Sequence, residues 1–194
     1  MATPRLSLMT AGLLTSLTLG AAELPPPAYQ LAAQAAGVPS HVLYGVALTE
    51  SGTRLSHGIR PWPWTLNIAG EGFRFKNRQA ACTALLSAIE MVGAKRVDAG
   101  LGQINIGWNG HYFNTPCEAL DPYKNLRIAA RLLRGHYDDT GDWVRAAGKY
   151  HHPAEGIYAK RYRAGFSRQV ARVMGIKEAE VPRALGLLQM ADNR

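Results

Sequence analysis

The sequence predicts a single α+β domain that is mostly helical and contains a small β-hairpin. Apolar residues recur at helical spacing before residue 52 and again after residue 121. Between these regions, PWPWTLNIAGEGFRF (61–75) combines prolines and aromatic residues with a glycine-rich turn, which is typical of a hairpin. A length of 194 residues is enough for one domain with a proper core. A small β-element enclosed by helices therefore indicates one α+β domain.

Each element of the first half has its own local signal. Ser40 is a good N-cap and Gly52 a good helix stop, so they delimit a helix. The segment VDAGLGQINIGW is too rich in glycine for a helix interior. The expected order is a helix at 28–37, a helix at 40–52, a hairpin formed by WTLNI, AGEG and FRF, a helix at 78–92, and an extended segment with a loop at 97–108.

The second half is expected to be helical throughout. Asp121 and Pro122 start one helix, and Asp142 caps the next. A long last helix follows, and each of the three carries an apolar stripe at i, i+3, i+4 and i+7 or a similar spacing. The stripes are Leu126, Ala129, Ala130 and Leu133, then Trp143, Ala146, Ala147 and Tyr150, then Tyr158, Tyr162, Phe166 and Val170.

The N-terminal residues have the pattern of a secretory signal peptide. Arg5 precedes an uncharged apolar run (6–19), and Gly20 and Ala22 supply the small residues of a cleavage site after Ala22. A retained membrane anchor is the alternative, but the run is short for a bilayer. We therefore expect an exported, periplasmic protein. Its predicted parts are a signal peptide (1–22), a proline-rich leader (23–27), a folded domain (28–175) and a C-terminal tail (176–194).

Export bears on whether the two cysteines form a disulfide. Cys82 and Cys117 are the only pair available, and an oxidising compartment favours a disulfide between them. The alternative is two buried thiols.

The chain is basic, and its formal charge of +8 falls to +7 once residues 1–22, with one arginine and no acid, are removed. Such a charge suits an anionic partner such as cell wall or nucleic acid. The densest stretch is 160–172, and a solvated helix face explains most of it better than a contact with DNA.

Glu50 is the candidate catalytic residue. It follows Val46 by four positions and Ala47 by three, so it shares their face in the last turn of its helix. Burial and the negative end of the helix dipole both raise the pKa of a carboxyl group there. A protonated acid near neutral pH is what general acid catalysis requires. The alternative is a glutamate that simply points into solvent.

Four local features stand in a specific order: TESG (49–52), GLGQIN (100–105), the helix NLRIAARLL from Asn125, and AGKYHH (147–152). Together they resemble the SLT-type lytic transglycosylases, relatives of goose-type lysozyme, over residues 28–173. The resemblance implies a lysozyme-like fold and a peptidoglycan substrate cut between MurNAc and GlcNAc. It also implies that Glu50 alone serves as acid and base and that 1,6-anhydro-MurNAc is formed without water. The DAGLGQIN context is most similar to the specialised transglycosylases of conjugation and secretion systems, which implies a trans-envelope complex as a further partner.

The resemblance also implies roles for the neighbours of Glu50. Tyr150 would orient Glu50 through its hydroxyl, while Gly100 and Gly102 would let the glycan approach the backbone. Trp62, Trp64 and Trp108 are candidates for the walls of a sugar-binding groove, although a tryptophan in a small domain is more often core. The residues expected to bind substrate are Ser51, Gln103, Ile104, Asn105 and Tyr150.

Three positions depart from the family pattern. Gly102 stands in place of the usual methionine, which should leave a barer patch of backbone for sugar. Ala129 stands where the pattern has glycine, and His151 stands where many members have asparagine. None of these changes removes the catalytic acid.

Several alternatives stay open at this point. Tyr150 has the periodicity of an ordinary core residue. Asp98 is expected to cap a turn, but if it faced Glu50 across a water molecule the reaction would be hydrolysis with inversion. A muramidase of the same fold and a wall-binding assembly factor without activity are the rival functions. His111, His151 and His152 lack metal-ligand spacing, so neither metal nor cofactor is expected.

Overall fold

A computed structural model describes residues 22–56 and 58–192 of the chain. The predicted signal peptide falls almost wholly outside these residues. In the described part, no helix combines the length and the apolar character needed to cross a bilayer. The fold is the expected one, a mostly helical α+β domain with two small antiparallel sheets.

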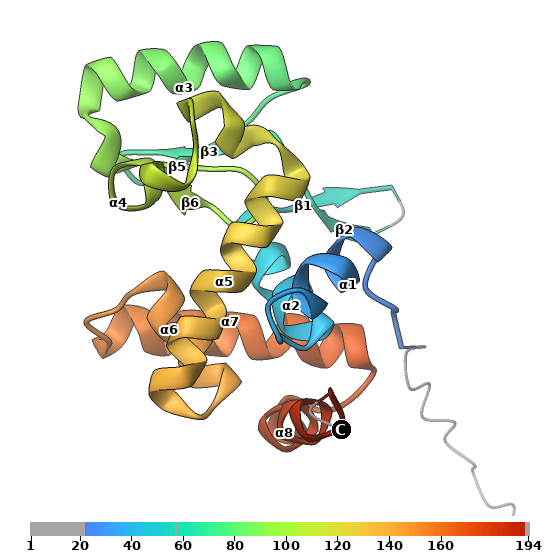
Figure 1. Cartoon of the computed structure of the whole chain (residues 1–194). Helices are drawn as coiled ribbons and strands as arrows, with labels where there is room; N and C mark the ends of the chain where they lie inside the picture. Colours follow the sequence, from blue (N-terminus) through green and yellow to red (C-terminus); the bar gives the residue numbers. More distant parts are fainter. Residues whose placement is uncertain (1–21, 57, 193–194) are drawn as a thin grey trace, which may run out of the picture.

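The longer elements are arranged in two layers (Figure 1). The upper layer holds a four-stranded sheet with α3 above it, and the lower layer is a group of helices; α5 runs from one layer to the other. The helices are α1 (Pro27–Gln34), α2 (Ser40–Ser51), α3 (Arg78–Val92), α4 (Ile106–Asn109), α5 (Pro122–Thr140), α6 (Trp143–His151), α7 (Gly156–Met174) and α8 (Val181–Asp192). Short 3-10 turns occupy Ala94–Arg96, Gly110–Tyr112, Pro116–Leu120 and Glu178–Glu180.

The larger sheet has the strand order β4-β3-β5-β6, and all its pairs are antiparallel. The predicted hairpin is present as β3 and β4, but its loop has two residues rather than the four of AGEG, because Glu71 and Gly72 already pair with Ile68 and Asn67. Both loop residues, Ala69 and Gly70, have positive φ, as in the tight turns that match strand twist. The sequence did not predict the second sheet, the hairpin β1-β2. The strands are β1 (Gly52–Leu55), β2 (Gly58–Pro61), β3 (Thr65–Ile68), β4 (Glu71–Arg74), β5 (Val97–Ala99) and β6 (Ile104–Asn105).

Helix boundaries follow the expected caps in most places. The side chains of Asp121 and Asp142 accept hydrogen bonds from backbone N–H groups in the first turns of α5 and α6, as predicted. α3 has the predicted bounds. The prediction for Ser40 was wrong, because Pro39 occupies the N-cap position and Ser40 is already helical.

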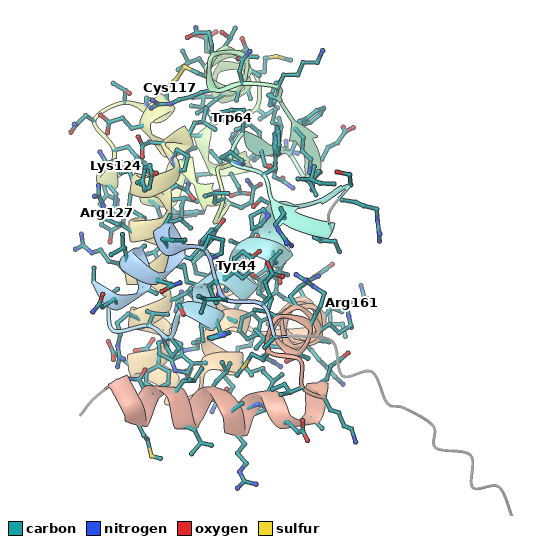
Figure 2. The ribbon with its side chains drawn as sticks, turned by 90° about the vertical axis from the view of Figure 1, so that its right-hand side faces the viewer. Tyr44, Trp64, Cys117, Lys124, Arg127 and Arg161 are labelled. Carbon is teal, nitrogen blue, oxygen red and sulfur yellow. A yellow bond between two sulfur atoms is a disulfide. The ribbon has the colours of Figure 1, made fainter. Side chains whose placement is uncertain are left out.

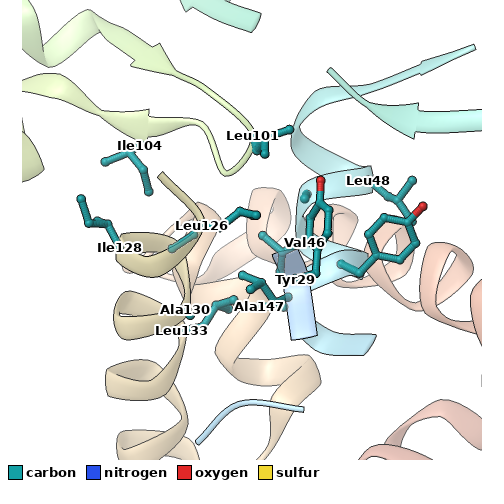
Figure 3. Packing of buried hydrophobic residues seen from close by; sticks show 14 of the residues in the cluster. Tyr29, Val46, Leu48, Leu101, Ile104, Leu126, Ile128, Ala130, Leu133 and Ala147 are labelled. Carbon is teal, nitrogen blue, oxygen red and sulfur yellow. The ribbon is translucent and has the colours of Figure 1, made fainter. Parts of the chain in front are cut away.

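α2 is buried on nearly all sides. Val42, Leu43, Val46 and Ala47 are at most 1% exposed, and Tyr44 on another face is equally buried. α7 packs along one side of α2, while α1 and α5 pack on others. Figure 3 shows side chains of α2, α5 and the loop before β6 meeting in one core. A helix enclosed in this way holds its C-terminal end rigidly between the two layers.

The C-terminal part is integrated into the domain, rather than forming the separate tail that the sequence suggested. α8 packs on α6 and α7, and its Val181 and Leu185 are fully buried. α8 crosses beneath α7 in two views at right angles (Figures 1 and 2). On the expected stripe of α7, Tyr162, Phe166 and Val170 are buried, but Tyr158 is 59% exposed.

The predicted disulfide between Cys82 and Cys117 is present. It joins α3 to the 3-10 turn at Pro116–Leu120, 35 residues further along the chain. The bridge therefore fixes α3 to the segment that leads into α5.

Candidate active site

Glu50 lies in the last turn of α2, where the helix faces the sheet. Its side chain is only 12% exposed. The pKa of Glu50 is raised from 4.5 to about 8, mainly by burial; a contact with the Tyr162 hydroxyl lowers it, and the charge of Asp98 raises it. Glu50 is therefore a protonated acid at neutral pH, as its position in the sequence predicted.

Two tyrosines lie near Glu50, Tyr150 of α6 and Tyr162 of α7, and the Tyr162 hydroxyl is the one in contact with its carboxyl group. The Tyr162 hydroxyl lies against the Glu50 carboxyl and is buried, yet it completes no hydrogen bond with any described residue. Hydrogen bonds of catalytic groups are often long without substrate and shorten when substrate binds. The Tyr150 hydroxyl instead donates to the carbonyl of Gly102, at 2.5 Å. The Tyr150 hydroxyl thus holds the glycine loop, and Tyr162 is a second candidate for the orienting role that the resemblance implies for Tyr150.

The loop between β5 and β6 is held by Asn125 of α5, which is completely buried. Its Oδ1 accepts from the Gly102 N–H at 2.8 Å, and its Nδ2 donates to the carbonyls of Ala99 and Ala119. Both polar ends of this side chain are thus used to fix backbone. The sequence placed Asn125 in a motif, but its function becomes clear only when these contacts are seen.

The glycines of this loop are not bare for sugar, contrary to the expectation. A Cβ on Gly100 would lie 2.3 Å from the Asn125 side chain, and one on Gly102 would lie 2.8 Å from the Cβ of Ala129 and 2.9 Å from the Tyr150 hydroxyl. The protein itself fills the space. Gly102 and Ala129, two departures from the family pattern, therefore lie against each other: the methyl group on α5 takes up room left by the missing side chain.

Most of the other predicted substrate-binding residues use polar atoms in hydrogen bonds within the protein. The Ser51 hydroxyl is fully buried and lies within hydrogen-bond distance of the carbonyls of Ala47 and Leu101, to one of which it donates its single proton, so it is not available to an N-acetyl group. The Gln103 Nε2 donates to the carbonyls of Thr65 and Gly100. Ser51 thus ties α2 to the glycine loop, and Gln103 ties that loop to β3.

Asn105 serves mainly to place Asp98. Its Nδ2 donates to Asp98 Oδ1 at 2.8 Å, and its Oδ1 caps α4 by accepting from the N–H groups of Gly107 and Trp108. The prediction that Asp98 caps a turn is wrong, because Asp98 is a residue of β5. Burial raises the pKa of Asp98, and the hydrogen bond from Asn105 lowers it. Asp98 shares one pocket with Glu50.

This pocket has a volume of about 600 Å³, within the range of ligand-binding sites. Acids, amides, imidazoles and aromatic rings all contribute to its wall. The lining residues are Glu50, Asn67, Asp98, Gln103, Ile104, Asn105, Trp108, Asn109, Leu132, His136, Tyr150, His151 and Pro153. Four of the predicted substrate-binding residues are among them, and Ser51 is not.

One of the three candidate tryptophans lies at the pocket. Trp108 lines it, is 65% exposed, and has the Lys95 ammonium 4.0 Å from its ring centre. Trp62 and Trp64 pack edge to face in the hairpin region, and the Trp62 indole N–H donates to the Phe75 carbonyl. Neither lines the pocket, so their expected contact with sugar is not supported.

Comparison of the chain with protein-family models, with curated proteins and with solved structures finds no match. The site must be interpreted from its own geometry. Among the described residues, no three His, Cys, Asp or Glu side chains are grouped so that they could hold a metal ion.

Sequence reasoning missed Tyr162, His136 and the position of His151. Tyr162 was placed on a core stripe, which is correct for its ring but says nothing of its hydroxyl. His151 was noted only as a departure from asparagine, yet its Nδ1 lies 3.9 Å from Glu50 Oε1. The signal that could have found both is that α6 and α7 pack on each other and on α2, which is a matter of tertiary structure.

Proposed function

We propose that this protein is a peptidoglycan lytic transglycosylase that uses Glu50 as its acid and base. The observation that carries the proposal is the buried carboxyl group of Glu50, with a pKa of about 8, at an open pocket lined by amide and aromatic groups. A neutral carboxyl group at physiological pH can protonate a leaving glycosidic oxygen. The family resemblance of the motifs supplies the substrate class, a glycan of MurNAc and GlcNAc, and the lysozyme-like fold.

The proposed reaction has two proton transfers. Glu50 first gives its proton to the glycosidic oxygen, while the N-acetyl oxygen of the same sugar stabilises the developing positive charge. The C6 hydroxyl then loses its proton and attacks C1, which closes an internal ether. The Tyr162 hydroxyl supports the first step, because it can donate to the Glu50 carboxylate once that group has lost its proton.

A digest of purified sacculi tests the proposal. The protein is expected to release fragments that end in 1,6-anhydro-MurNAc, each lighter by one water than the hydrolysed product. Glu50→Gln keeps the size of the side chain but removes the acid, so it should release none. Reducing ends alone would contradict the assignment.

A hydrolytic muramidase with inversion is the second candidate, and the position of Asp98 favours it. Asp98 faces the same pocket as Glu50, and an inverting enzyme needs one carboxyl group as acid and another as base for water. Digestion in ¹⁸O-labelled water separates the two reactions, since only hydrolysis places the label at the new sugar end. Asp98→Asn should abolish a hydrolytic reaction and leave anhydro-sugar formation in place.

We further propose that the protein is exported to the periplasm and opens the wall locally for a conjugation or secretion apparatus. A wall-binding assembly factor without activity is the rival. Cells that carry Glu50→Gln decide between them: loss of transfer or secretion, with normal protein levels, supports catalysis. Full transfer by this variant would favour the assembly factor.

A further inference from the structure

A row of polar side chains crosses three neighbouring strands of the larger sheet. Asn67 of β3 pairs with Asp98 of β5, and Asp98 pairs in turn with Asn105 of β6. Residues directly opposite each other in antiparallel strands point to the same face, with their Cβ atoms about 5 Å apart. All three residues line the pocket that contains Glu50. The polar row therefore forms one continuous part of the pocket wall, against which a ligand can lie.

The pleat of the sheet explains why this row faces the pocket. Successive residues of a strand point to opposite faces. The adjacent row, formed by Leu66, Ala99 and Ile104, is at most 1% exposed. α3 lies over the sheet (Figure 1) and contacts both β3 and β5. The apolar row thus belongs to the core, while each member of the polar row is partly exposed.

Two polar atoms of the row are left for a ligand. Asn105 uses both ends of its side chain, because its Nδ2 donates to Asp98 Oδ1 and to the Lys95 carbonyl and its Oδ1 caps α4. Asn67 Oδ1 accepts from the Gly70 N–H at 2.9 Å, so its Nδ2 points the other way. Among the described residues, none forms a hydrogen bond with Asn67 Nδ2 or with Asp98 Oδ2. A donor and an acceptor from directly opposite residues thus remain available.

We propose that Asp98 and Asn67 bind a GlcNAc unit of the glycan by the edge that carries C2 and C3. Asp98 Oδ2 accepts the N–H of the 2-acetamido group, and Asn67 Nδ2 donates to the oxygen on C3 of the same ring. The two substituents are neighbours on the sugar, as the two side chains are neighbours on the sheet. This inference rests on the proposed function, and it names the sugar that this part of the pocket recognises and the atoms that recognise it.

The oxygen on C3 decides between the two sugars of the glycan. In GlcNAc it is a free hydroxyl, whereas in MurNAc it carries the lactyl branch. A ring edge that lies on the sheet, with a hydrogen bond at both positions, leaves no room for such a branch. The N-acetyl oxygen of the reacting MurNAc is also needed at C1 in the proposed reaction. The sugar bound by Asp98 and Asn67 is therefore a GlcNAc next to the reacting MurNAc.

The first experiment measures binding without cleavage, in the Glu50→Gln background. Titration calorimetry compares the tetramer of GlcNAc (chitotetraose) with cellotetraose, in which a hydroxyl replaces each acetamido group. Asp98→Asn keeps an oxygen for Asn105 but turns an NH₂ group toward the ligand. An acetamido N–H can only donate and is repelled, whereas a hydroxyl can turn and accept. We expect the affinity for chitotetraose to fall about 10-fold and that for cellotetraose to change little. Equal losses for both ligands, or no binding of chitotetraose before Asp98 is changed, would overturn the inference.

Asn67→Ala tests the other contact in the same assay. The C3 hydroxyl is common to both tetramers, so this variant should weaken the binding of both by a similar factor, about 5-fold. Asn77→Ala is the matched control, because Asn77 also accepts from a backbone N–H three residues on but caps α3 outside the pocket. Glu71→Gln, an exposed acid on β4, controls for the charge removed in Asp98→Asn. Both controls should keep the affinities of the parent protein. Unchanged affinities in Asn67→Ala would overturn the contact with C3.

Digestion of sacculi by Asp98→Asn, with Glu50 intact, separates binding from catalysis. KM should rise about 10-fold while kcat stays close to that of wild type, because only binding is weakened. A general base for water would instead be needed in the chemical step. A fall in kcat of about 100-fold with unchanged KM would therefore overturn the binding role and favour the hydrolytic reaction. A wild type that releases no glycan fragments would contradict the proposed function, whereas calorimetry would still decide whether Asp98 and Asn67 bind GlcNAc.

Discussion

The raised pKa of Glu50 makes the stability of the fold depend on pH in a predictable direction. The folded protein keeps this proton up to about pH 8, whereas the unfolded chain releases it near pH 4.5. Between these values the folded state binds more protons, so the free energy of unfolding falls as pH rises. Glu50→Gln has no proton to release and should escape this loss.

The size of the effect follows from the two pKa values. Each pKa unit corresponds to 1.36 kcal/mol, so the difference between 4.5 and about 8 amounts to about 5 kcal/mol above pH 8 and about 3 kcal/mol at pH 7. The side chain is only 12% exposed, so screening by solvent reduces this little. Glu50→Gln should therefore equal wild type in stability at pH 4.5 and exceed it by about 3 kcal/mol at pH 7. In a domain of this size that corresponds to roughly 6–12 °C in Tm.

Urea denaturation of both proteins at pH 4.5, 6, 7 and 8 measures this difference. Only the gap between variant and wild type matters, because groups far from Glu50 titrate equally in both. Glu90→Gln, an exposed acid on α3, is the control and should show no such gap. A gap between Glu50→Gln and wild type that stays constant from pH 4.5 to pH 8 would refute the argument that Glu50 is buried and protonated.

Three further predictions concern the groups that hold the site. Asn125→Ala leaves the Gly102 N–H and the carbonyls of Ala99 and Ala119 without their hydrogen-bond partner in the interior. The free energy of unfolding, measured by urea denaturation, should therefore fall by about 2–4 kcal/mol. A fall of less than about 1 kcal/mol would contradict the described contacts. Replacing Cys82 and Cys117 together by serine should lower the free energy of unfolding by about 2–4 kcal/mol. Wild type treated with reductant should match that variant. Equal stability of wild type with and without reductant would argue against the bridge. Gly102→Ala should cost about 1–3 kcal/mol through its clashes with the Ala129 methyl group and the Tyr150 hydroxyl. The pair Gly102→Ala with Ala129→Gly should recover the part of this loss that is due to the methyl group; losses that simply add would show that the two positions do not compensate.

The sequence predicted those elements whose signals are local. The caps at Asp121 and Asp142, the bounds of α3 and the presence of a hairpin turn after Ile68 each depend on a few adjacent residues. The sequence also predicted that the Glu50 carboxyl is buried, but the reason for its burial is partly different from the apolar face on which the prediction was based. α2 is apolar on almost every side, so the carboxyl is buried because the whole helix is central, and not because one face is apolar.

What could not be predicted depends on contacts between distant segments. Tyr162 and Tyr150 have the same chemistry and both lie on apolar stripes. Only the packing of α7 against α2 decides that Tyr162 contacts Glu50 while Tyr150 bonds to Gly102. Ser51 was read from a motif as a group for substrate, yet its position on α2 turns the hydroxyl toward the carbonyl of Leu101.

These contacts suggest why so many polar groups at the pocket are already bonded to the protein. A buried acid with a raised pKa destabilises the fold at neutral pH, so its surroundings must keep their shape without help from Glu50 itself. Asn125 and Ser51 do this by fixing the glycine loop from α5 and α2, and Gln103 of the loop itself bonds to β3. The groups left to meet a ligand are then few and lie at the rim, Trp108 and His151 among them. Substitutions inside the loop network should therefore change stability first, whereas substitutions at the rim should change the pH profile or substrate affinity while the fold stays intact.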